Sequence, residues 1–199
     1  DIVPDEGEMA LEDLIANEPV IITLTHNGLV KRTNISSYRA QRRGGKGVIG
    51  METRGKTAVQ GTDTDFIEHL FTASTHDYLM FFTNTGRVYV ERVHEIPDMG
   101  RTSKGRSIAN VLELQAGEKI AAMKRVEGKY GDNKEDITFR QEDAYVFYAT
   151  ANGTVKKTAL SDFANVRKGG IIAIKIVDGD DLIEVKLTDG HDEIVVAAH

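Results

Sequence analysis

The sequence predicts an all-β protein made of repeated four-stranded units. Apolar runs rich in β-branched and aromatic residues recur, and each run leads into a polar turn that ends in glycine. The turn glycines, Gly28, Gly86 and Gly153, place the repeats about 60 residues apart. No alternation of strand-length and helix-length segments is visible, which argues against a parallel α/β sheet. Repeats of this length with four short strands are typical of propeller-like architectures.

Three segments of the chain align with one another. They read VIITLTHNGLVKRTNISSYRAQRRGGKG (20–47), YLMFFTNTGRVYVERVHEIPDMGRTSKG (78–105) and YVFYATANGTVKKTALSDFANVRKGG (145–170). Each begins with a strand, turns at its glycine and continues into a second short strand, which is the signature of a β-hairpin. Each then reaches a basic, glycine-containing loop, written QRRGGKG, GRTSKG or VRKGG. A further apolar strand follows the loop, for example IIAIKIV at 171–177.

Other predicted strands open with an acidic turn. They are DTDFIEHLFTAS (63–74), GEKIAAMKRV (117–126) and GDDLIEVKLT (179–188). The last residues, HDEIVVAAH at 191–199, match HDYLMFFTN at 76–84, so a fourth repeat begins there. We therefore expect the chain to be a fragment, of about three and a half repeats, from a longer array.

The repeats suggest boundaries for the domain and its blades. We expect an acidic linker at 1–17 and a partial domain at 18–199, with blade 1 at about 18–65, blade 2 at about 66–125, an insertion at 127–143, blade 3 at about 144–188 and the start of blade 4 at 189–199. The insertion is polar and without clear periodicity, which predicts a mobile surface segment. In the acidic leader, EMALEDLIANE is compatible with a short helix or with a strand.

Charge is unevenly distributed along the 199 residues, whose net charge is −6. Residues 1–30 hold seven acids and no lysine or arginine, so the rest of the chain is close to neutral and carries basic patches. The sequence contains no cysteine, which rules out disulfides and thiolate metal sites. It shows no signal peptide and no apolar run of about 18–20 residues, which predicts a cytoplasmic protein.

One glycine-rich loop concentrates positive charge without any acid. Arg39, Arg42, Arg43 and Lys46 are interleaved with glycines, which let backbone N–H groups converge on an anion. Arginine forks and a lysine ammonium group pair well with phosphate oxygens. The loop has no helix to enter a groove and no aromatic platform beyond Tyr38, so the expected contact is with the backbone of duplex DNA, independent of base sequence. The alternative to a DNA contact is a solvent-exposed turn whose cations only keep the chain soluble.

Equivalent positions in the other repeats are also basic. The strand after each hairpin turn and the loop beyond it supply further cations, and we predict that these lie on one rim and bind DNA: Lys31, Arg32, Arg39, Arg87, Arg92, Arg101, Lys104, Arg106, Lys156, Lys157, Arg167 and Lys168. If the repeats are arranged radially, these cations form a curved track that bends the duplex. Bending DNA is costly, so many phosphate contacts are needed to hold it.

The loop sequence QRRGGKG at 41–47 is identical to the motif known as the gyrase A box, and STHDYLMFFTNTGRVY and ATANGTVKKTALSDF extend the likeness. The chain thus resembles the C-terminal domain of the DNA gyrase A protein. The resemblance implies a β-pinwheel, a propeller-like disc that wraps DNA around its basic rim and directs a DNA segment to the cleavage core for ATP-dependent negative supercoiling. Domains of this family usually have six blades, so the disc here is expected to be incomplete. The resemblance assigns DNA wrapping to the box residues Gln41, Arg42, Arg43, Gly44, Gly45, Lys46 and Gly47.

The resemblance also implies partners and cofactors. The partners are double-stranded DNA, the N-terminal cleavage domain of gyrase A, and the gyrase B protein, in an A₂B₂ heterotetramer. This domain is expected to need no cofactor, whereas other domains of the complex use ATP and Mg²⁺. The parent would be an ATP-hydrolysing type II DNA topoisomerase, an isomerase of the bacterial cytoplasm and nucleoid, whose catalytic tyrosine lies in the N-terminal domain.

No catalytic or metal site is expected in this chain by itself. Its six histidines are scattered without the spacing of metal ligands, and it has no phosphate-binding loop for ATP. Two other functions stay open: the corresponding C-terminal domain of topoisomerase IV, which usually has a degenerate box, and a propeller-like module that binds proteins, in which the basic loops are incidental. The intact box favours gyrase. The acidic leader either links to the cleavage core or occupies the basic rim.

Overall fold

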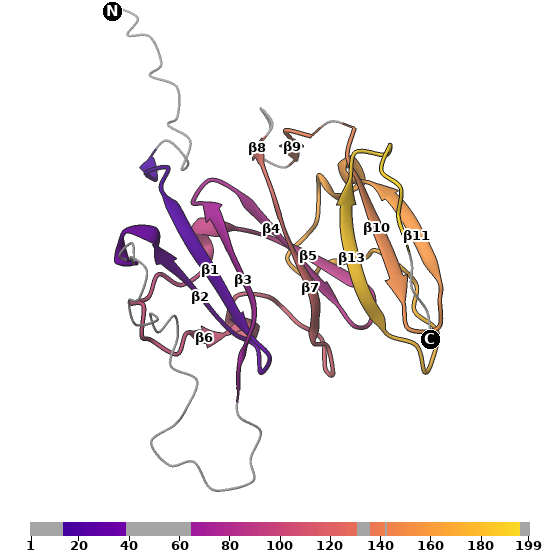
Figure 1. Cartoon of the computed structure of the whole chain (residues 1–199), viewed down its shortest axis with the longest axis horizontal. Coiled ribbons are helices and arrows are strands. Elements are labelled where there is room, and N and C mark those ends of the chain that lie inside the picture. The colour runs from indigo at the N-terminus through magenta and orange to yellow at the C-terminus, as the bar shows by residue number, and fades with distance from the viewer. Residues whose placement is uncertain (1–13, 39–64, 131–135, 142, 196–199) are drawn as a thin grey trace, which may run out of the picture. The chain divides into compact units, whose positions relative to one another are not determined.

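Strands account for almost all the regular structure in the computed structural model, which describes residues 14–38, 65–130, 136–141 and 143–195 (Figure 1). Within these ranges no α-helix occurs, and short 3-10 turns connect strands: η2 (Ile35–Ser37), η3 (Val93–Glu95), η4 (Ile108–Asn110) and η5 (Leu160–Phe163). The all-β prediction is therefore confirmed. In the part of the chain that is described, no helix has the length and apolarity needed to span a bilayer.

The chain divides into two compact units, one of Asp1–Asp77 and Arg92–Ile108, the other of Tyr78–Glu91 and Ala109–His199. The first unit is built on a four-stranded antiparallel sheet. Its strands, in hydrogen-bonded order, are β3 (Ile67–Ser74), β1 (Pro19–Thr25), β2 (Leu29–Asn34) and β6 (Arg106–Ser107). Both faces of β1 are covered, since every residue from Val20 to Thr25 is buried.

The second unit contains two larger sheets and a small one. One sheet has the order β12 (Ile171–Ile172), β5 (Arg87–Arg92), β4 (Tyr78–Thr83) and β7 (Ile120–Val126). The next has the order β11 (Val155–Ala159), β10 (Tyr145–Thr150) and β13 (Leu182–Thr188). The small sheet pairs β8 (Gly128–Tyr130) with β9 (Ile137–Phe139).

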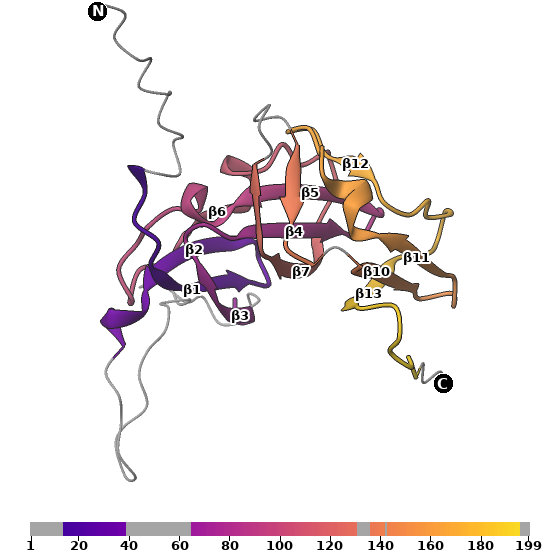
Figure 2. The same cartoon turned by 90° about the horizontal axis from the view of Figure 1, so that it is seen from above.

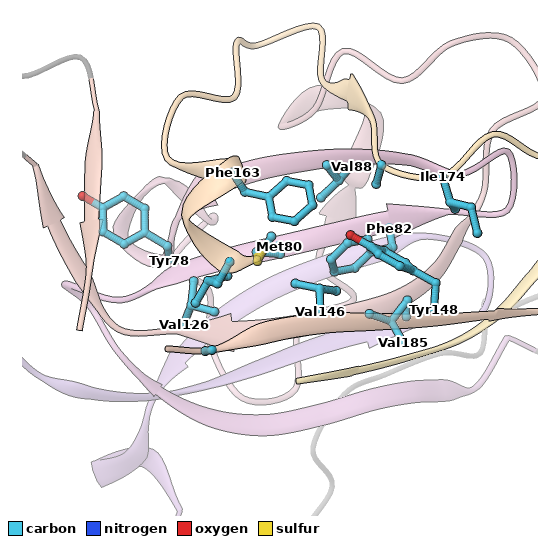
Figure 3. Close-up of a cluster of buried hydrophobic side chains, with 14 of the residues drawn as sticks. Tyr78, Met80, Phe82, Val88, Val126, Val146, Tyr148, Phe163, Ile174 and Val185 are labelled. Carbon is cyan, nitrogen blue, oxygen red and sulfur yellow. The ribbon is translucent and has the colours of Figure 1, made fainter. Parts of the chain in front are cut away.

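A hydrophobic core joins the two larger sheets of the second unit. Figure 3 shows side chains from β4, β10, β13 and η5 pointing toward one another, among them Met80, Val185 and Phe163. The rings of Phe82 and Tyr148 meet edge to face, with their centroids 5.7 Å apart, a favoured arrangement for aromatic pairs. The alternating burial of β10 follows from this packing, because one face of the strand lies on the core and the other does not.

The three hairpins predicted from the turn glycines are present and share one hydrogen-bond pattern. Gly28, Gly86 and Gly153 have φ near +80° (79°, 83° and 84°), which a residue without a Cβ adopts at little cost. Each glycine N–H donates to the carbonyl of the threonine three residues before it, at 2.9–3.0 Å. The Oγ1 of that same threonine accepts from the N–H after the glycine. The threonines are buried, so the motif Thr-x-x-Gly satisfies its own polar groups.

Short strands pair with the repeat before their own. β6 follows the basic loop of the second repeat, yet it pairs with β2 of the first, through Leu29↔Ser107 and Val30↔Arg106. β12 follows the loop of the third repeat and pairs with β5 of the second (Figure 2). The sheet of the first unit thus extends beyond 18–65, the range expected for a first blade. Its outer strands, β3 and β6, cover the two edges of the β1–β2 hairpin.

The insertion at 127–143 differs from the expectation of a polar surface segment. Its described residues include the β8–β9 pair, and Ile137 and Phe139 are buried in the hydrophobic core. The N–H of Ile137 donates to the carbonyl of Ala164 at 2.8 Å, which ties β9 to the end of η5. Ile137 and Phe139 are buried and Thr138 between them is exposed, which is the alternation of a strand with one face on the core.

Candidate nucleic-acid interface

The gyrase A box lies outside the described residues, as does Arg39. The box comprises Gln41, Arg42, Arg43, Gly44, Gly45, Lys46 and Gly47. The equivalent loops of the second and third repeats are described, and they show how such a loop is built in this fold. The loop of the second repeat belongs to the first unit, and the loop of the third repeat belongs to the second unit.

Lys31 lies under the loop of the second repeat and is fully buried. Its Nζ donates hydrogen bonds to the carbonyl oxygens of Gly100 (3.1 Å), Arg101 (2.5 Å) and Ser103 (3.0 Å). An ammonium group has three N–H donors, so these bonds use all of them. Burial, together with the positive charge of Arg101, lowers the pKa of Lys31. Lys31 cannot take the DNA-contacting role predicted for it, because it supports the loop from inside.

Arg32 secures the chain that leads into the same loop. Its Nε donates to the carbonyl of Ile96 at 3.2 Å, and its guanidinium lies 3.7 Å from a carboxylate oxygen of Asp98. The backbone of Arg32 also exchanges hydrogen bonds with Pro97 and Met99. Its side chain is only 16% exposed, so most of it packs within the protein. This predicted rim cation is therefore largely a structural residue.

Arg92 and Arg101 are half-buried, whereas Lys104 and Arg106 are exposed. Arg92 Nη1 lies 3.2 Å from Nε2 of His94, whose side chain is buried. Gly105, between the two exposed cations, has φ of 84°, a left-handed conformation that turns the chain before β6. Of the cations predicted in this loop, Lys104 and Arg106 are thus the ones presented to solvent.

Arg87 supports the loop of the third repeat in a similar way. Its Nη1 donates to the carbonyls of Gly169 (3.2 Å) and Gly170 (3.3 Å), and its side chain is 19% exposed. Gly170 has φ of 65°, and a Cβ there would come within 2.7 Å of the Val88 carbonyl oxygen, so glycine is required. The predicted cations Arg167 and Lys168, on the outside of this loop, are exposed.

Glu118 fixes Arg87 from the opposite side. Its carboxylate lies 3.4 Å from Arg87 Nε and accepts hydrogen bonds from Tyr89 Oη (2.6 Å), Thr85 Oγ1 (2.8 Å) and the Gln115 N–H (2.8 Å). Its side chain is only 2% exposed. Burial by itself would raise the pKa of Glu118, but the hydrogen bonds and the Arg87 charge lower it overall. Sequence reasoning missed this residue, although it marked 117–126 as opening with an acidic turn.

The acidic turns also fasten the hairpins. Asp65 Oδ1 accepts from the N–H of Asn27, and Asp180 Oδ1 accepts from the N–H of Asn152, both at 2.9 Å. Each asparagine directly precedes a turn glycine. These acids therefore hold the hairpin turn against the strand that begins after them, which gives them a structural role.

Tyr89 provides a test of the network around Glu118. Burial, and then the hydrogen bond to Glu118, raise the pKa of Tyr89 to about 12. Because the folded pKa lies above the ordinary value of 10, the neutral hydroxyl stabilises the fold below pH 10, and this contribution is lost between pH 10 and about 12. We expect the free energy of unfolding to fall less over this interval in Tyr89→Phe than in the wild type, measured by urea denaturation at each pH. Parallel curves would contradict the assignment.

Lys156 and Lys157 lie on β11 and are exposed, although each also makes a contact within the protein. Lys156 Nζ donates to the carbonyl of Ala173 at 2.7 Å, and Lys157 Nζ lies 4.6 Å from the centre of the Tyr145 ring. A cation over an aromatic face is held loosely and stays available to an anion.

The predicted cations that the structure describes thus fall into two groups. Lys31, Arg32, Arg87, Arg92 and Arg101 are engaged with the protein, and the others face solvent: Lys104, Arg106, Arg167 and Lys168 on the loops, and Lys156 and Lys157 on β11. Three of the loop cations are adjacent to a glycine, Lys104 and Arg106 to Gly105 and Lys168 to Gly169, and exposed cations are the side chains that phosphate contacts use. Within the described ranges no three histidine or acidic side chains are grouped so as to hold a metal ion.

Antiparallel repeats that pass a strand to the preceding repeat, with exposed cations on the loops, define a propeller-like β protein suited to a polyanion. The family described as the DNA gyrase C-terminal domain, beta-propeller, matches residues 19–73, 77–127 and 144–189, which is more than half of the chain. The chain belongs to this family.

Individual proteins agree with the family match. The DNA gyrase A protein of Neisseria gonorrhoeae is 45% identical over 198 residues, which is 98% of this chain and 19% of that protein. The solved C-terminal domain of DNA topoisomerase IV is 30% identical with a TM-score of 0.64, covering 88% of this chain and 47% of that one. The solved DNA gyrase A C-terminal domain is 27% identical with a TM-score of 0.55, covering 86% and 48%. The chain spans about one fifth of the length of the curated relatives it matches.

Proposed function

We propose that this chain binds duplex DNA through its phosphate backbone, without reading base sequence, and bends it. The observation that carries the proposal is the construction of the two described loops. Each turns backbone carbonyls inward onto a cation of the preceding repeat and leaves its own cations exposed: Lys104 and Arg106 on one loop, Arg167 and Lys168 on the other. Cations on a fixed loop pair with phosphate oxygens at little entropic cost.

The same role fits a longer protein of the kind that the curated relatives represent, the DNA gyrase A protein. We infer that the chain acts as the DNA-wrapping part of a DNA gyrase A protein, with the box as a principal contact, and directs a DNA segment for ATP-dependent negative supercoiling. The N-terminal cleavage domain and the gyrase B protein would complete an A₂B₂ complex in the bacterial cytoplasm and nucleoid. ATP and Mg²⁺ would be used by those other parts, and this chain by itself would not be an enzyme.

The corresponding domain of topoisomerase IV is the second candidate, favoured by the TM-score of 0.64 to its solved structure. The curated relatives at 44–45% identity are DNA gyrase A proteins, and the intact QRRGGKG sequence agrees with them. The gyrase assignment therefore has the stronger support.

The salt dependence of DNA binding tests the proposed contact. Each phosphate contact contributes about −0.9 to the slope of log affinity against log salt concentration. We expect alanine at Lys104, Arg106, Arg167 and Lys168 together to make that slope shallower by about 3 to 4 units, for a duplex of mixed sequence. A matched variant carries alanine at four exposed cations outside the loops, Lys119, Lys129, Arg140 and Lys186, and loses the same charge.

The comparison between these two variants decides the result. A slope that becomes shallower only in the loop variant supports local phosphate contacts. If the slope becomes equally shallow in both variants, the loss of net charge alone explains the effect. Binding that is absent, or indifferent to salt, would overturn the proposal and favour a module that binds proteins.

A further inference from the structure

Each described loop lies over a cation of the preceding repeat, Lys31 or Arg87, and DNA binding by exposed residues does not require such a cation. Lys31 is the clearer case, since its ammonium group is fully buried and bonded to three carbonyls of a loop from the next repeat. Burying a charge costs free energy unless the group is hydrogen-bonded, and at Lys31 the three carbonyls offset that cost. A residue that only filled space here would not need to be a lysine.

The second repeat shows that the fold accepts another residue type at this place. Lys31 is the third residue after its turn glycine, and Tyr89 is the third after Gly86. Tyr89 is also buried, and its ring lies beneath Gly170, where an added Cβ would approach it to 2.9 Å. There Arg87, from a different position on the strand, bonds the loop carbonyls instead. In both units a cation donates hydrogen bonds to the loop carbonyls, but the cation is Lys31 in the first unit and Arg87 in the second.

The bonds from Lys31 fix how the loop faces solvent. The turn from Gly100 to Ser103 is closed by an N–H of Ser103 that donates to Gly100 at 3.0 Å, and the Gly100 carbonyl accepts from Lys31 as well. With three carbonyls directed at Nζ, the chain that continues to Lys104 and Arg106 starts from a fixed point. Arg106 is then held by the β6 pairing with Val30, the residue next to Lys31.

We propose that Lys31 is a positioning residue for DNA binding, which holds the loop of Gly100–Ser103 so that Lys104 and Arg106 meet phosphates. This inference rests on the proposed function. Without the buried ammonium group, the three carbonyls lose their donor and the loop samples other conformations, so both exposed cations pay an ordering cost on binding. Lys31 therefore acts on DNA without touching it.

The test is a double-mutant cycle on the salt slope, with the full 199-residue chain. Lys31→Met gives an unbranched apolar side chain that is one atom shorter than lysine, and it removes the donors. We expect it to weaken binding on the order of tenfold and to make the slope shallower by about 1 to 2 units. In a chain that already lacks both loop cations (Lys104→Ala with Arg106→Ala), the same substitution is expected to change the slope little, because nothing is left to position.

Chemical rescue separates positioning from general damage. In Lys31→Ala, n-propylammonium supplies the atoms that were removed and is expected to restore the slope. Tetramethylammonium at equal concentration has the same charge but no N–H donors and is expected to restore nothing. If Lys31 variants do not fold, Ser103→Gly keeps the buried contact and loosens the loop, and it is expected to show a smaller loss of slope.

The outcomes distinguish the two proposals. A wild-type slope in Lys31→Met, or in Ser103→Gly, would overturn the positioning role, as would an equal loss with and without the loop cations. Wild-type protein that binds DNA without salt dependence would instead overturn the proposed function, and this inference with it.

Discussion

Alanine at Arg42, Arg43 and Lys46 is expected to abolish negative supercoiling by the full-length gyrase A protein in its complex with gyrase B, while ATP-independent relaxation continues. Three lost phosphate contacts lower affinity on the order of a hundredfold at about 0.1 M salt. Bending a duplex depends on the sum of such contacts, since the bend itself costs about 1–6 kcal/mol. Relaxation needs cleavage and passage of DNA but no directed wrap, so it is expected to persist. Agarose-gel assays of both activities, with and without ATP, measure the outcome.

The control for this prediction is a charge-matched variant with alanine at Lys119, Lys129 and Lys186, exposed lysines away from the loops. It is expected to supercoil DNA normally. A box variant that loses relaxation and supercoiling to the same degree would show damage to the whole assembly, and would count against a wrapping role for the box.

Local features of the fold were predictable because their causes are local. The hairpins follow from a strand, a glycine with positive φ and a second strand, and all three turn glycines have that conformation. The acidic turns were also recognised, although their purpose was not. Asp65 and Asp180 accept hydrogen bonds from hairpin residues that are 38 and 28 positions away. Local sequence patterns span far fewer residues, so they could not identify these partners.

Pairing across repeats was not predictable from the strands themselves. β6 and β12 are two residues long, and so short a segment has no periodicity that could identify its partner. Their place is set by the preceding hairpin, which offers an unpaired edge. For the same reason blade ranges drawn along the chain do not coincide with the sheets.

The candidate site was predicted as a set of cations, and burial divides that set. Lys31 directly follows the buried Val30 on β2, so strand alternation alone gave no warning that Lys31 is buried too. Alignment of the repeats does not settle the matter, since the equivalent residues are Tyr89, which is buried, and Lys156, which is exposed. Arg87 was predicted to be on the rim because nothing in the sequence places Glu118 beside it.

Glu118→Ala is expected to lower the free energy of unfolding of the second unit by about 3 kcal/mol or more. The substitution leaves the largely buried Arg87 guanidinium without its carboxylate and the Gln115 N–H without its acceptor, so two polar groups lose their partners at once. Urea denaturation followed by tyrosine fluorescence measures the loss, since the chain has six tyrosines and no tryptophan. Glu184→Ala is the matched control, because that carboxylate is 52% exposed and pairs with Lys186 at 3.8 Å. It is expected to change stability by less than about 0.5 kcal/mol.

Acid pH supplies a second readout of the same residue. The folded pKa of Glu118 lies below the ordinary value of 4.5, so its carboxylate stabilises the fold above pH 4.5, and this contribution is lost as the pH falls through the folded pKa. The gap in stability between the wild type and Glu118→Ala is therefore expected to be constant from pH 8 to about 5 and to narrow below 4.5. The Glu118 carboxylate holds Arg87, and Arg87 in turn holds the loop that carries Arg167 and Lys168. The slope of log DNA affinity against log salt concentration is therefore expected to become shallower in the wild type over the same acidic range. A stability gap that stays constant down to pH 3 would mean that the charge on Glu118 does not support Arg87.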